Sequence, residues 1–368
     1  MRVMLVGGGT AGHINPALAA AKYIRKKHPD AELLFIGTQR GLEKTLVPRE
    51  GFDIQFIEVQ GFKRSLSPKN LIAIAKAALA YSKSAGIIKR FKPDVVIGTG
   101  GYVSGPVLAA AAKKGVPTLI HEPNVSAGLT SKMLSKMVDV VCVSFEESRR
   151  YFPEAKKIVL TGNAIRAELF EYTKAAAREA LGLDGRPFIA VFGGSLGAKK
   201  INESVAEFIK STIGRSDFQL LLAAGSAHYE AVSKMISGLG VTEQTAPHIK
   251  VVEYIHNMAQ VMNAADIVVA RAGAITVSEI TALGKPSVLI PSPNVTDNHQ
   301  EHNARALEKA GAAIVLTEGE LTDGVFSCAL SELVFDTERL DGMSVRSAEM
   351  GIKNGAEKIY DEIKAIIK

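Results

Sequence analysis

Two glycine-rich stretches decide the fold of this chain: Arg2-Val-Met-Leu-Val-Gly-Gly-Gly-Thr-Ala-Gly-His13 and Phe188-Ile-Ala-Val-Phe-Gly-Gly-Ser-Leu-Gly-Ala-Lys199. Each begins with an apolar run typical of a buried parallel strand and leads into a helical pattern. Glycine lets the backbone approach an anion closely, and a following helix directs unpaired N–H groups at it. The two stretches therefore predict two nucleotide-type domains and an enzyme that handles a phosphorylated substrate on both.

The rest of the chain alternates strand-like and helix-like segments, which is typical of βαβ units and parallel sheets. In the first half the predicted strands are Val3–Val6, Leu33–Ile36, Ile54–Ile57, Val95–Gly98, Thr118–His121 and Val138–Val143. In the second half they are Phe188–Phe192, Gln219–Ala223, Ile249–Val252, Ile267–Ala270, Ser287–Ile290 and Ala313–Leu316. Helical patterns lie between them, for example over Pro16–Lys27 and Val103–Lys114.

With 368 residues, the chain is longer than one compact core usually allows. We therefore expect an α/β protein with two Rossmann-like parallel-sheet domains that face a cleft. The boundary is expected near Thr161–Arg166, before a charged, alanine-rich helix at Thr173–Leu181. The predicted domains are residues 1–163 and 164–343, and residues 344–368 are predicted to form a single terminal helix.

Composition argues against several classes of protein. The two cysteines, Cys142 and Cys328, form no C-x-x-C pair, so neither a disulfide framework nor a thiolate metal site is expected. The sequence has no D-x-D, and His299 and His302 have no third ligand type nearby, so we expect no metal ion. The first residues enter a strand rather than a signal peptide, and no apolar run approaches the ~18–20 residues of a spanning helix. We therefore expect a cytosolic protein that reaches a membrane only from one side.

The net charge of +6 is concentrated between Lys63 and Lys92, where eight Lys or Arg residues occur without any Asp or Glu. Four of the basic residues recur every seven positions, and an apolar stripe accompanies them: Lys69, Lys76, Lys83 and Arg90, with Leu71, Ile74, Ala75, Ala78 and Leu79. Such a helix suits an anionic lipid surface, although a solvated basic face is the simpler interpretation. Nucleic acid is not an expected partner, because neither interleaved aromatic residues nor a nucleic-acid motif accompanies the charge.

The first glycine loop satisfies the dinucleotide pattern G-x-G-x-x-G over Gly7–Gly12. A dinucleotide site also needs an acidic residue at the end of the second strand, to hold a ribose. Here that strand ends in Gly37-Thr38, and Glu32 precedes it, so a dehydrogenase is disfavoured. A Walker loop is excluded, because the only Gly-Lys pair, Gly284-Lys285, is followed by proline.

Several polar residues stand where strands of this fold end. His13, at the start of a helix, would stay neutral and could act as a general base, or it could simply hydrogen-bond the turn. Ser195 could donate to a phosphate or serve as a helix N-cap. Glu279 could accept two ribose hydroxyls or merely stabilise a helix start.

Further polar groups follow other strands of the sheets. The loop Asp297-Asn-His-Gln300 suits sugar hydroxyls, and the segments Gly98-Thr-Gly-Gly-Tyr102 and His121-Glu-Pro-Asn124 end neighbouring strands of the first half. Open α/β sheets bind ligands at such ends, so an acceptor pocket is expected beside the first glycine loop.

Seven of these segments, in this order and spacing, resemble a known family along nearly the whole chain: GGGTAGH, GTGGY, HEPN, GNAIR, GGSLGA, RAGAITVSE and DNHQ. It is the peptidoglycan glycosyltransferase family that adds N-acetylglucosamine to undecaprenyl-pyrophosphoryl-N-acetylmuramyl-pentapeptide (lipid I), giving lipid II. The resemblance implies a GT-B fold whose C-terminal helix crosses back onto the first domain. It also implies peripheral attachment to the cytoplasmic face of the cell membrane, with the Lys63–Lys92 region docking on anionic lipid, and roles in cell shape and division.

The resemblance implies specific residues as well. UDP-N-acetylglucosamine would bind the second half, with Arg166 and Ser195 at the pyrophosphate, the backbone of Ile255 at the uracil and Glu279 at the ribose. The same site would include Gln300 at the sugar hydroxyls, Asn124 from the first domain, and the lining run Ala274, Ile275, Thr276, Val277, Ser278 and Glu279. Thr10, Ala11, Gly12 and His13 would lie over the donor sugar and the acceptor pyrophosphate.

Two positions depart from the family pattern: Ala11 stands where glycine is usual, and Pro123 where glutamine is common. If position 11 required a positive φ, alanine there would cost about 1 kcal/mol or more.

From these assignments we expect a direct, inverting displacement without a cofactor or metal. The C4 hydroxyl of the muramyl sugar would attack the anomeric carbon, with His13 as base and Arg166 and backbone N–H groups stabilising the departing UDP. Alternatives are another GT-B transferase, a UDP-N-acetylglucosamine epimerase, and a membrane-associated nucleotide-binding protein without activity.

Overall fold

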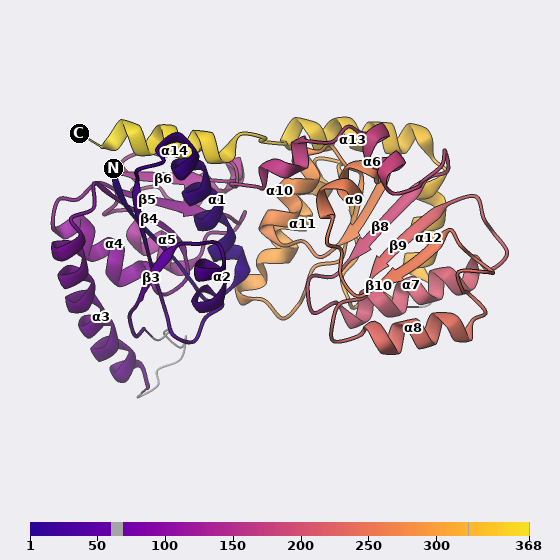
Figure 1. The fold of residues 1–368 in the computed structure, drawn as a ribbon, viewed down its shortest axis with the longest axis horizontal. Helices are drawn as coiled ribbons and strands as arrows, with labels where there is room; N and C mark the ends of the chain where they lie inside the picture. The colour runs from indigo at the N-terminus through magenta and orange to yellow at the C-terminus, as the bar shows by residue number, and fades with distance from the viewer. Residues whose placement is uncertain (60–68, 323, 368) are drawn as a thin grey trace. The chain divides into compact units, whose positions relative to one another are not determined.

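The computed structural model describes residues 1–59, 69–322 and 324–367. The chain divides into two compact units, each with its own parallel sheet (Figure 1). Unit 1 comprises Met1–Ile165 together with Ile352–Lys368, and unit 2 comprises Arg166–Gly351. The two Rossmann-like sheets confirm the predicted fold class.

Unit 1 is built on a seven-stranded parallel sheet in the order β3-β2-β1-β4-β5-β6-β7. The strands in that order are β3 (Asp53–Phe56), β2 (Glu32–Gly37), β1 (Arg2–Gly7), β4 (Val95–Gly100), β5 (Thr118–Glu122), β6 (Val140–Val143) and β7 (Ile158–Leu160). The order reverses between β1 and β4, which makes their carboxyl ends the switch point where doubly wound sheets bind ligands.

Helices cover both faces of this sheet. They are α1 (Ala11–Lys27), α2 (Glu43–Arg49), α3 (Lys69–Phe91), α4 (Ser104–Lys113), α5 (Leu129–Leu134), the 3₁₀ helix η1 (Glu146–Tyr151) and α14 (Gly355–Ile366). Side chains of α1 and α14 share one core with the strands, for example Ile24 and Ile363. Those of α3 and α4 form the core of the opposite face, for example Ile87 and Leu108. The C-terminal helix α14 therefore completes the first sheet, beside α1 (Figure 1).

Unit 2 repeats the same topology with six strands in the order β10-β9-β8-β11-β12-β13. The strands are β10 (Ile249–Val252), β9 (Gln219–Ala223), β8 (Phe188–Phe192), β11 (Ile267–Ala270), β12 (Ser287–Leu289) and β13 (Ala313–Val315). The helices are η2 (Ala167–Phe170), α6 (Lys174–Ala180), α7 (Lys199–Ser211), α8 (Tyr229–Gly238), α9 (Met258–Ala264), α10 (Ala274–Ala282), η3 (Thr296–Asn298), α11 (His299–Lys309), α12 (Val325–Val334) and α13 (Thr337–Met350). Here the switch point lies between β8 and β11.

The structure differs from the sequence expectations at three places. A short strand, β7, was not predicted, because Ile158–Leu160 is only half-buried and follows two lysines. Helix α1 begins at Ala11 rather than at Pro16, so the proline lies inside the helix and denies the carbonyl of Gly12 its usual N–H partner.

The single terminal helix predicted over 344–368 is wrong. It is two helices, with α13 in unit 2 and α14 in unit 1. Glycines flank the break: a Cβ on Gly351 would lie 2.3 Å from the carbonyl oxygen of Thr281, and one on Gly355 would lie 2.2 Å from that of Asn163. Close backbone packing at both glycines thus accompanies the interruption of the helix.

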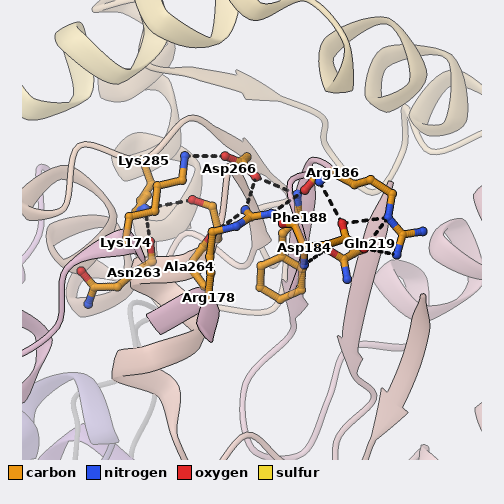
Figure 2. A network of polar contacts seen from close by, with 11 residues as sticks. Lys174, Arg178, Asp184, Arg186, Phe188, Gln219, Asn263, Ala264, Asp266 and Lys285 are labelled. Atoms are coloured by element: carbon orange, nitrogen blue, oxygen red, sulfur yellow. Dashed lines mark hydrogen bonds and ion pairs between the residues drawn. The ribbon is translucent and has the colours of Figure 1, made fainter. Parts of the chain in front are cut away.

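A network of hydrogen bonds and ion pairs connects α6 to the amino ends of β8 and β11, two central strands of unit 2 (Figure 2). Asp266, just before β11, accepts hydrogen bonds from Lys174 Nζ at 2.5 Å, Arg178 Nη1 at 2.9 Å and the backbone N–H of Phe188 at 2.7 Å. The buried ammonium of Lys285 donates to the carbonyls of Asn263 and Ala265. Because these groups lie at the strand ends opposite the switch point, the network stabilises unit 2 rather than forming part of a ligand site.

Asp266→Asn should destabilise unit 2 by about 1–3 kcal/mol near pH 7, because it weakens three hydrogen bonds at a largely buried carboxylate. Burial raises the pKa of Asp266, but hydrogen bonds from Lys174 and Phe188 outweigh it, so the net pKa is lowered. The stability due to ionised Asp266 is therefore present above the unfolded pKa near ~3.9 and lost as pH falls through the folded pKa. Urea unfolding at pH 7 and at pH 3 would measure the free energy of unfolding of the wild type and of Asp266→Asn. The difference between the two proteins should be smaller at pH 3.

The matched control is Asp217→Asn, at a carboxylate that pairs with Arg215 on the surface. It should change stability by less than about 0.5 kcal/mol. Equal losses for the two variants would contradict the role given to the network.

Candidate active site

The first glycine loop joins β1 to α1 at the switch point of unit 1 and is held by neighbouring backbone. A Cβ on Gly101, which follows β4, would lie 2.4 Å from the carbonyl oxygen of Gly8, so the two strand ends can approach this closely only because residue 101 is glycine. Thr10 is the N-cap of α1, and Ala11 and Gly12 form its first turn. Ala11 has no positive φ, so alanine fits this position without backbone strain.

A buried carboxylate lies beneath this loop. Glu43, the first residue of α2, accepts hydrogen bonds from the N–H of Gly9 at 3.0 Å, the N–H of Thr38 at 2.7 Å and the Thr38 hydroxyl at 2.8 Å. Its side chain is completely buried. The carboxylate thus links the end of β2 to the glycine loop.

His13 lies in the first turns of α1 and is fixed by Thr99 at the end of β4. Its Nδ1 is 3.1 Å from the carbonyl oxygen of Thr99, and the Thr99 hydroxyl donates to the carbonyl of His13 at 2.6 Å. A carbonyl oxygen only accepts, so we assign the proton to Nδ1. The neutral ring then presents Nε2 as a proton acceptor.

Burial lowers the pKa of His13, and this effect exceeds the opposing attraction of Glu122 and the hydrogen bond to Thr99. The sequence predicted a neutral His13 from its place at a helix start, whereas here burial is the main cause. The neighbouring His121 is fully buried at the end of β5, and burial lowers its pKa to about 4. Near neutral pH both imidazoles are therefore uncharged.

Asn124 is held at the same strand end by Glu122. Both its backbone N–H and its Nδ2 donate to Glu122 Oε1, at 3.1 and 3.3 Å, and the N–H of Gly128 donates to Oε2 at 3.1 Å. Unit 1 therefore brings Thr10, Ala11, Gly12, His13 and Asn124 to the carboxyl edge of one sheet.

The second glycine loop, between β8 and α7, has the same tight backbone packing. A Cβ on Gly197, where φ is +82°, would lie 1.9 Å from the carbonyl oxygen of Ala224. Ser195 is exposed within this loop. Helix α7 begins at Lys199 with Ala198 as its N-cap, so the alternative that Ser195 caps the helix is wrong.

Arg166 and Glu279 form a direct pair in unit 2. Arg166 Nε donates to Glu279 Oε1 at 2.7 Å; the carboxylate side chain is 6% exposed and the arginine 47%, so the carboxylate is nearly enclosed while the cation still faces outward. Burial raises the pKa of Glu279, and the Arg166 charge and hydrogen bond oppose that rise.

Helix α10 supplies the rest of the predicted lining. It begins at Ala274, and its first turn contains Ile275, Thr276 and Val277, whose N–H groups lie near the helix start. Ser278 and Glu279 follow and are buried. Ile255, in the loop after β10, is also buried.

The polar loop before α11 is shaped by two residues with positive φ, Asp297 and Asn298. Gln300, in the first turn of α11, accepts the N–H of Ser292 through Oε1 at 2.9 Å, so its amide oxygen is used within unit 2. Arg271, after β11, donates to the carbonyls of Ile290 and Pro291 and pairs with Glu318, so it braces the strand ends.

Within the described ranges 1–59, 69–322 and 324–367, no group of three or more His, Cys, Asp or Glu side chains is arranged to hold a metal ion.

The predicted site residues are divided between the two units. His13 and Asn124 belong to unit 1, and Arg166, Ser195, Ile255, the α10 residues and Gln300 to unit 2.

The sequence prediction missed Glu43 and the Arg166–Glu279 pair. An acidic residue at the very end of the second strand was sought, but Glu43 comes later and returns to that strand end from α2. The spacing Thr38, Gly41, Glu43 was the only local signal. Arg166 and Glu279 are 113 residues apart, and no local pattern indicates their contact.

Two Rossmann-like units with glycine loops at their switch points, a buried carboxylate paired with an arginine in one and a neutral histidine in the other, form an arrangement that suits a nucleotide-sugar glycosyltransferase. The chain belongs to glycosyltransferase family 28. The model of the family's N-terminal domain matches residues 3–143, and that of its C-terminal domain matches residues 188–359.

Similar proteins span the whole chain. A protein of Acetivibrio thermocellus is 51% identical over 100% of this chain and 99% of its own length, and one of Listeria monocytogenes is 47% identical over 100% of both. Both are named UDP-N-acetylglucosamine–N-acetylmuramyl-(pentapeptide) pyrophosphoryl-undecaprenol N-acetylglucosamine transferase.

Solved structures agree on the fold. The crystal structure of Acinetobacter baumannii MurG has a TM-score of 0.82 at 30% identity and covers 99% of both chains. A UDP-N-acetylglucosamine 2-epimerase from Neisseria meningitidis has a TM-score of 0.66 at 17% identity, covering 99% of this chain and all of that one, which indicates a shared fold only.

Gly100→Ala should remove most of the transferase activity without unfolding unit 1. Gly100 has φ +112°, and an added Cβ would lie 2.3 Å from His13 Nδ1, so the ring must leave its position against Thr99. We expect kcat to fall about 10²-fold or more, as for loss of a positioned general base. Steady-state kinetics and thermal unfolding would measure the two effects.

Gly115→Ala is the matched control, since its φ is +71° and an added Cβ would meet nothing within 4 Å. Gly115→Ala bears a backbone cost of about 1–2 kcal/mol without any collision, and only Gly100→Ala displaces the histidine. An equal loss of kcat in the two variants would contradict the conclusion that activity depends on the position of the His13 ring against Thr99.

Proposed function

We infer that this glycosyltransferase transfers N-acetylglucosamine from UDP-N-acetylglucosamine to lipid I, forming lipid II for peptidoglycan. The main support is sequence identity of 46–51% over the full chain with proteins named UDP-N-acetylglucosamine–N-acetylmuramyl-(pentapeptide) pyrophosphoryl-undecaprenol N-acetylglucosamine transferase. The arrangement of side chains agrees, since one unit offers a neutral histidine and the other a buried carboxylate paired with an arginine.

Unit 2 would bind the donor. Glu279 would accept hydroxyls of the ribose, the backbone of Ile255 would face the uracil, and Gln300 would donate to the sugar. Ser195, Arg166 and the start of α7 would hold the pyrophosphate, and the run Ala274–Glu279 would line the nucleotide site. Asn124, a residue of unit 1, would also bind the donor sugar.

Unit 1 would bind the acceptor, with its pyrophosphate against Thr10, Ala11 and Gly12. Nε2 of His13 would take the proton of the muramyl C4 hydroxyl as that oxygen attacks the anomeric carbon and inverts it. Negative charge then builds on the β-phosphate of UDP, where Arg166 and fixed N–H groups would stabilise it without a metal ion.

An assay with UDP-N-acetylglucosamine and a short-chain lipid I analogue tests this function. We expect a β-linked disaccharide lipid and UDP as the products, at undiminished rate in EDTA. Loss of activity in chelator that magnesium restores would contradict metal independence. Release of free sugar without lipid product would favour an epimerase, and tight UDP binding without turnover a nucleotide-binding protein.

Arg166→Ala should lower kcat by about 10²–10³-fold, more than it weakens UDP binding at pH 8, because its charge would act on the departing diphosphate.

The same Arg166→Ala substitution should also make UDP binding depend on pH. Burial already raises the pKa of Glu279, and Arg166 is the group that opposes the rise. Without it, Glu279 would be protonated at higher pH, so calorimetric UDP affinity should fall more steeply than in the wild type from pH 8 to pH 5.

The control is the double variant Arg166→Ala/Glu279→Gln, which has no carboxyl to titrate at this position. Its UDP affinity should be weak and flat over the same pH range. A wild-type kcat in Arg166→Ala, or an unchanged pH dependence, would exclude the assigned role.

We propose that the protein docks peripherally on the cytoplasmic face of the cell membrane through α3. Lys83, Lys89 and Arg90 are exposed on this helix, and Leu79 is 72% exposed beside them, so charge and an apolar group share the surface. The side chains of residues 60–75, which include Lys63, Arg64, Lys69, Leu71, Ile74 and Ala75, lie outside the described part. In the described helices, no segment is long and apolar enough to cross a bilayer.

Replacing Lys76, Lys83 and Arg90 together by Gln should weaken binding to phosphatidylglycerol vesicles by roughly 3 kcal/mol, about 1 kcal/mol per charge. Sedimentation with vesicles would measure it. The matched triple variant replaces Lys210, Lys234 and Lys250, exposed residues of unit 2, and should bind like the wild type. Equal weakening in both would mean that net charge alone attracts the protein.

A further inference from the structure

We propose that Glu43 is a positioning residue for the acceptor site: its carboxylate fixes the first glycine loop in the form that receives the acceptor diphosphate. This inference rests on the proposed function, which places the acceptor at Thr10–Gly12, and adds a residue outside that site.

The carboxylate is built into the loop rather than lying beside it. Cβ atoms placed on three glycines would collide with the Glu43 side chain: 2.7 Å at Gly8, 2.4 Å at Gly37 and 2.0 Å at Gly41. These glycines leave room for one buried carboxyl group between the end of β2 and the loop. Among the residues that the structure describes, no basic side chain forms an ion pair with it.

The two carboxylate oxygens have different tasks. Oε1 accepts the N–H and hydroxyl of Thr38, and Oε2 accepts the N–H of Gly9. Gly9 is exposed, has φ +90°, and would meet nothing within 4 Å if given a Cβ, so no side-chain packing restrains its turn. The hydrogen bond to Glu43 therefore restrains the turn at Gly9 itself, between the backbone contact of Gly8 and the start of α1 at Thr10, Ala11 and Gly12.

The same bond determines which N–H groups remain for a ligand. The N–H of Gly9 is used internally, so an incoming diphosphate must take the N–H groups that follow it, next to His13. A carboxylate on the inner side of the loop also repels a phosphate that approaches from the β2 end, where a dinucleotide would lie in this fold. Glu43 thus directs the anion to the side of the loop that carries the base.

Glu43→Gln tests this at constant volume. The amide oxygen should stay with the two donors of Thr38, which leaves the amide nitrogen facing the Gly9 N–H, donor against donor. We expect the KM for the lipid I analogue to rise about tenfold or more and kcat to fall similarly, the usual scale for losing a charged hydrogen bond. The KM for UDP-N-acetylglucosamine should stay within about twofold, because the donor belongs to unit 2.

Thr38→Val is the matched control. It removes one hydrogen bond from the same carboxylate and the acceptor of the Gly41 N–H, both on the side away from the loop, so it should cost similar thermal stability with acceptor KM within about threefold of wild type. If Glu43 had only a structural role, Glu43→Gln and Thr38→Val would behave alike. Alternatively, the KM values for both substrates would stay unchanged while the fraction of active enzyme fell. Either result would overturn the proposal.

A double-mutant cycle with Gly9→Ala asks whether Glu43 acts through the loop. If it does, the double variant should raise the acceptor KM by less than the product of the two single effects. A rise equal to that product would contradict an action through the loop. Should Glu43→Gln not fold, Gly9→Ala alone must raise acceptor KM while donor KM holds; a shift of both or neither rejects the proposal. A wild-type enzyme that fails to make lipid II in the same assay rejects the proposed function instead.

Discussion

Close backbone contact at the carboxyl ends of the central strands is the constraint on which both ligand sites depend. In unit 2, a Cβ on Gly225 would lie 2.0 Å from the backbone nitrogen of Gly197, so two successive strand ends touch through glycine alone. In unit 1 the close contact lies instead between the ends of β1 and β4, where a Cβ on Gly101 would lie 2.4 Å from the carbonyl oxygen of Gly8. This approach holds each loop at the edge of its sheet, where the following helix starts and directs its N–H groups outward.

Two buried carboxylates are satisfied in different ways, and the difference suits different tasks. Glu279 relies on one arginine that is itself half-exposed, so the pair can exchange partners when a ligand arrives. Glu43 relies on two backbone N–H groups and a hydroxyl within its own fold and has no solvent contact. The first arrangement is suited to binding, because the cation can move, and the second to holding a shape, because its donors cannot.

The sequence predicted the sheets well because fully buried parallel strands are continuous apolar runs, as in β8 and β11, whose bounds match the expectation. It failed where burial is partial, at β7, and where a proline suggested a helix start, at Pro16. The terminal helix was misjudged because the break at Gly351–Asn354 reflects packing against two separate units. Site residues could be named from motifs, but the contact of Arg166 with Glu279 and the return of Glu43 to β2 depend on tertiary structure alone.

The two units share one strand order yet use their glycine loops differently. In unit 1 the N–H of Gly9 donates to Glu43, whereas in unit 2 the N–H of Gly197 donates to the carbonyl of Gly194 within the loop itself, at 3.0 Å. Among the described residues no carboxylate is bonded to this second loop, so the nucleotide diphosphate of the proposed function would meet its remaining N–H groups without a nearby negative charge. The first loop gives up one N–H and gains a fixed shape next to a neutral histidine. Under the proposed function, one topology would hold a leaving diphosphate in one unit and orient an attacking hydroxyl in the other, because a single buried carboxylate changes which N–H groups the loop presents.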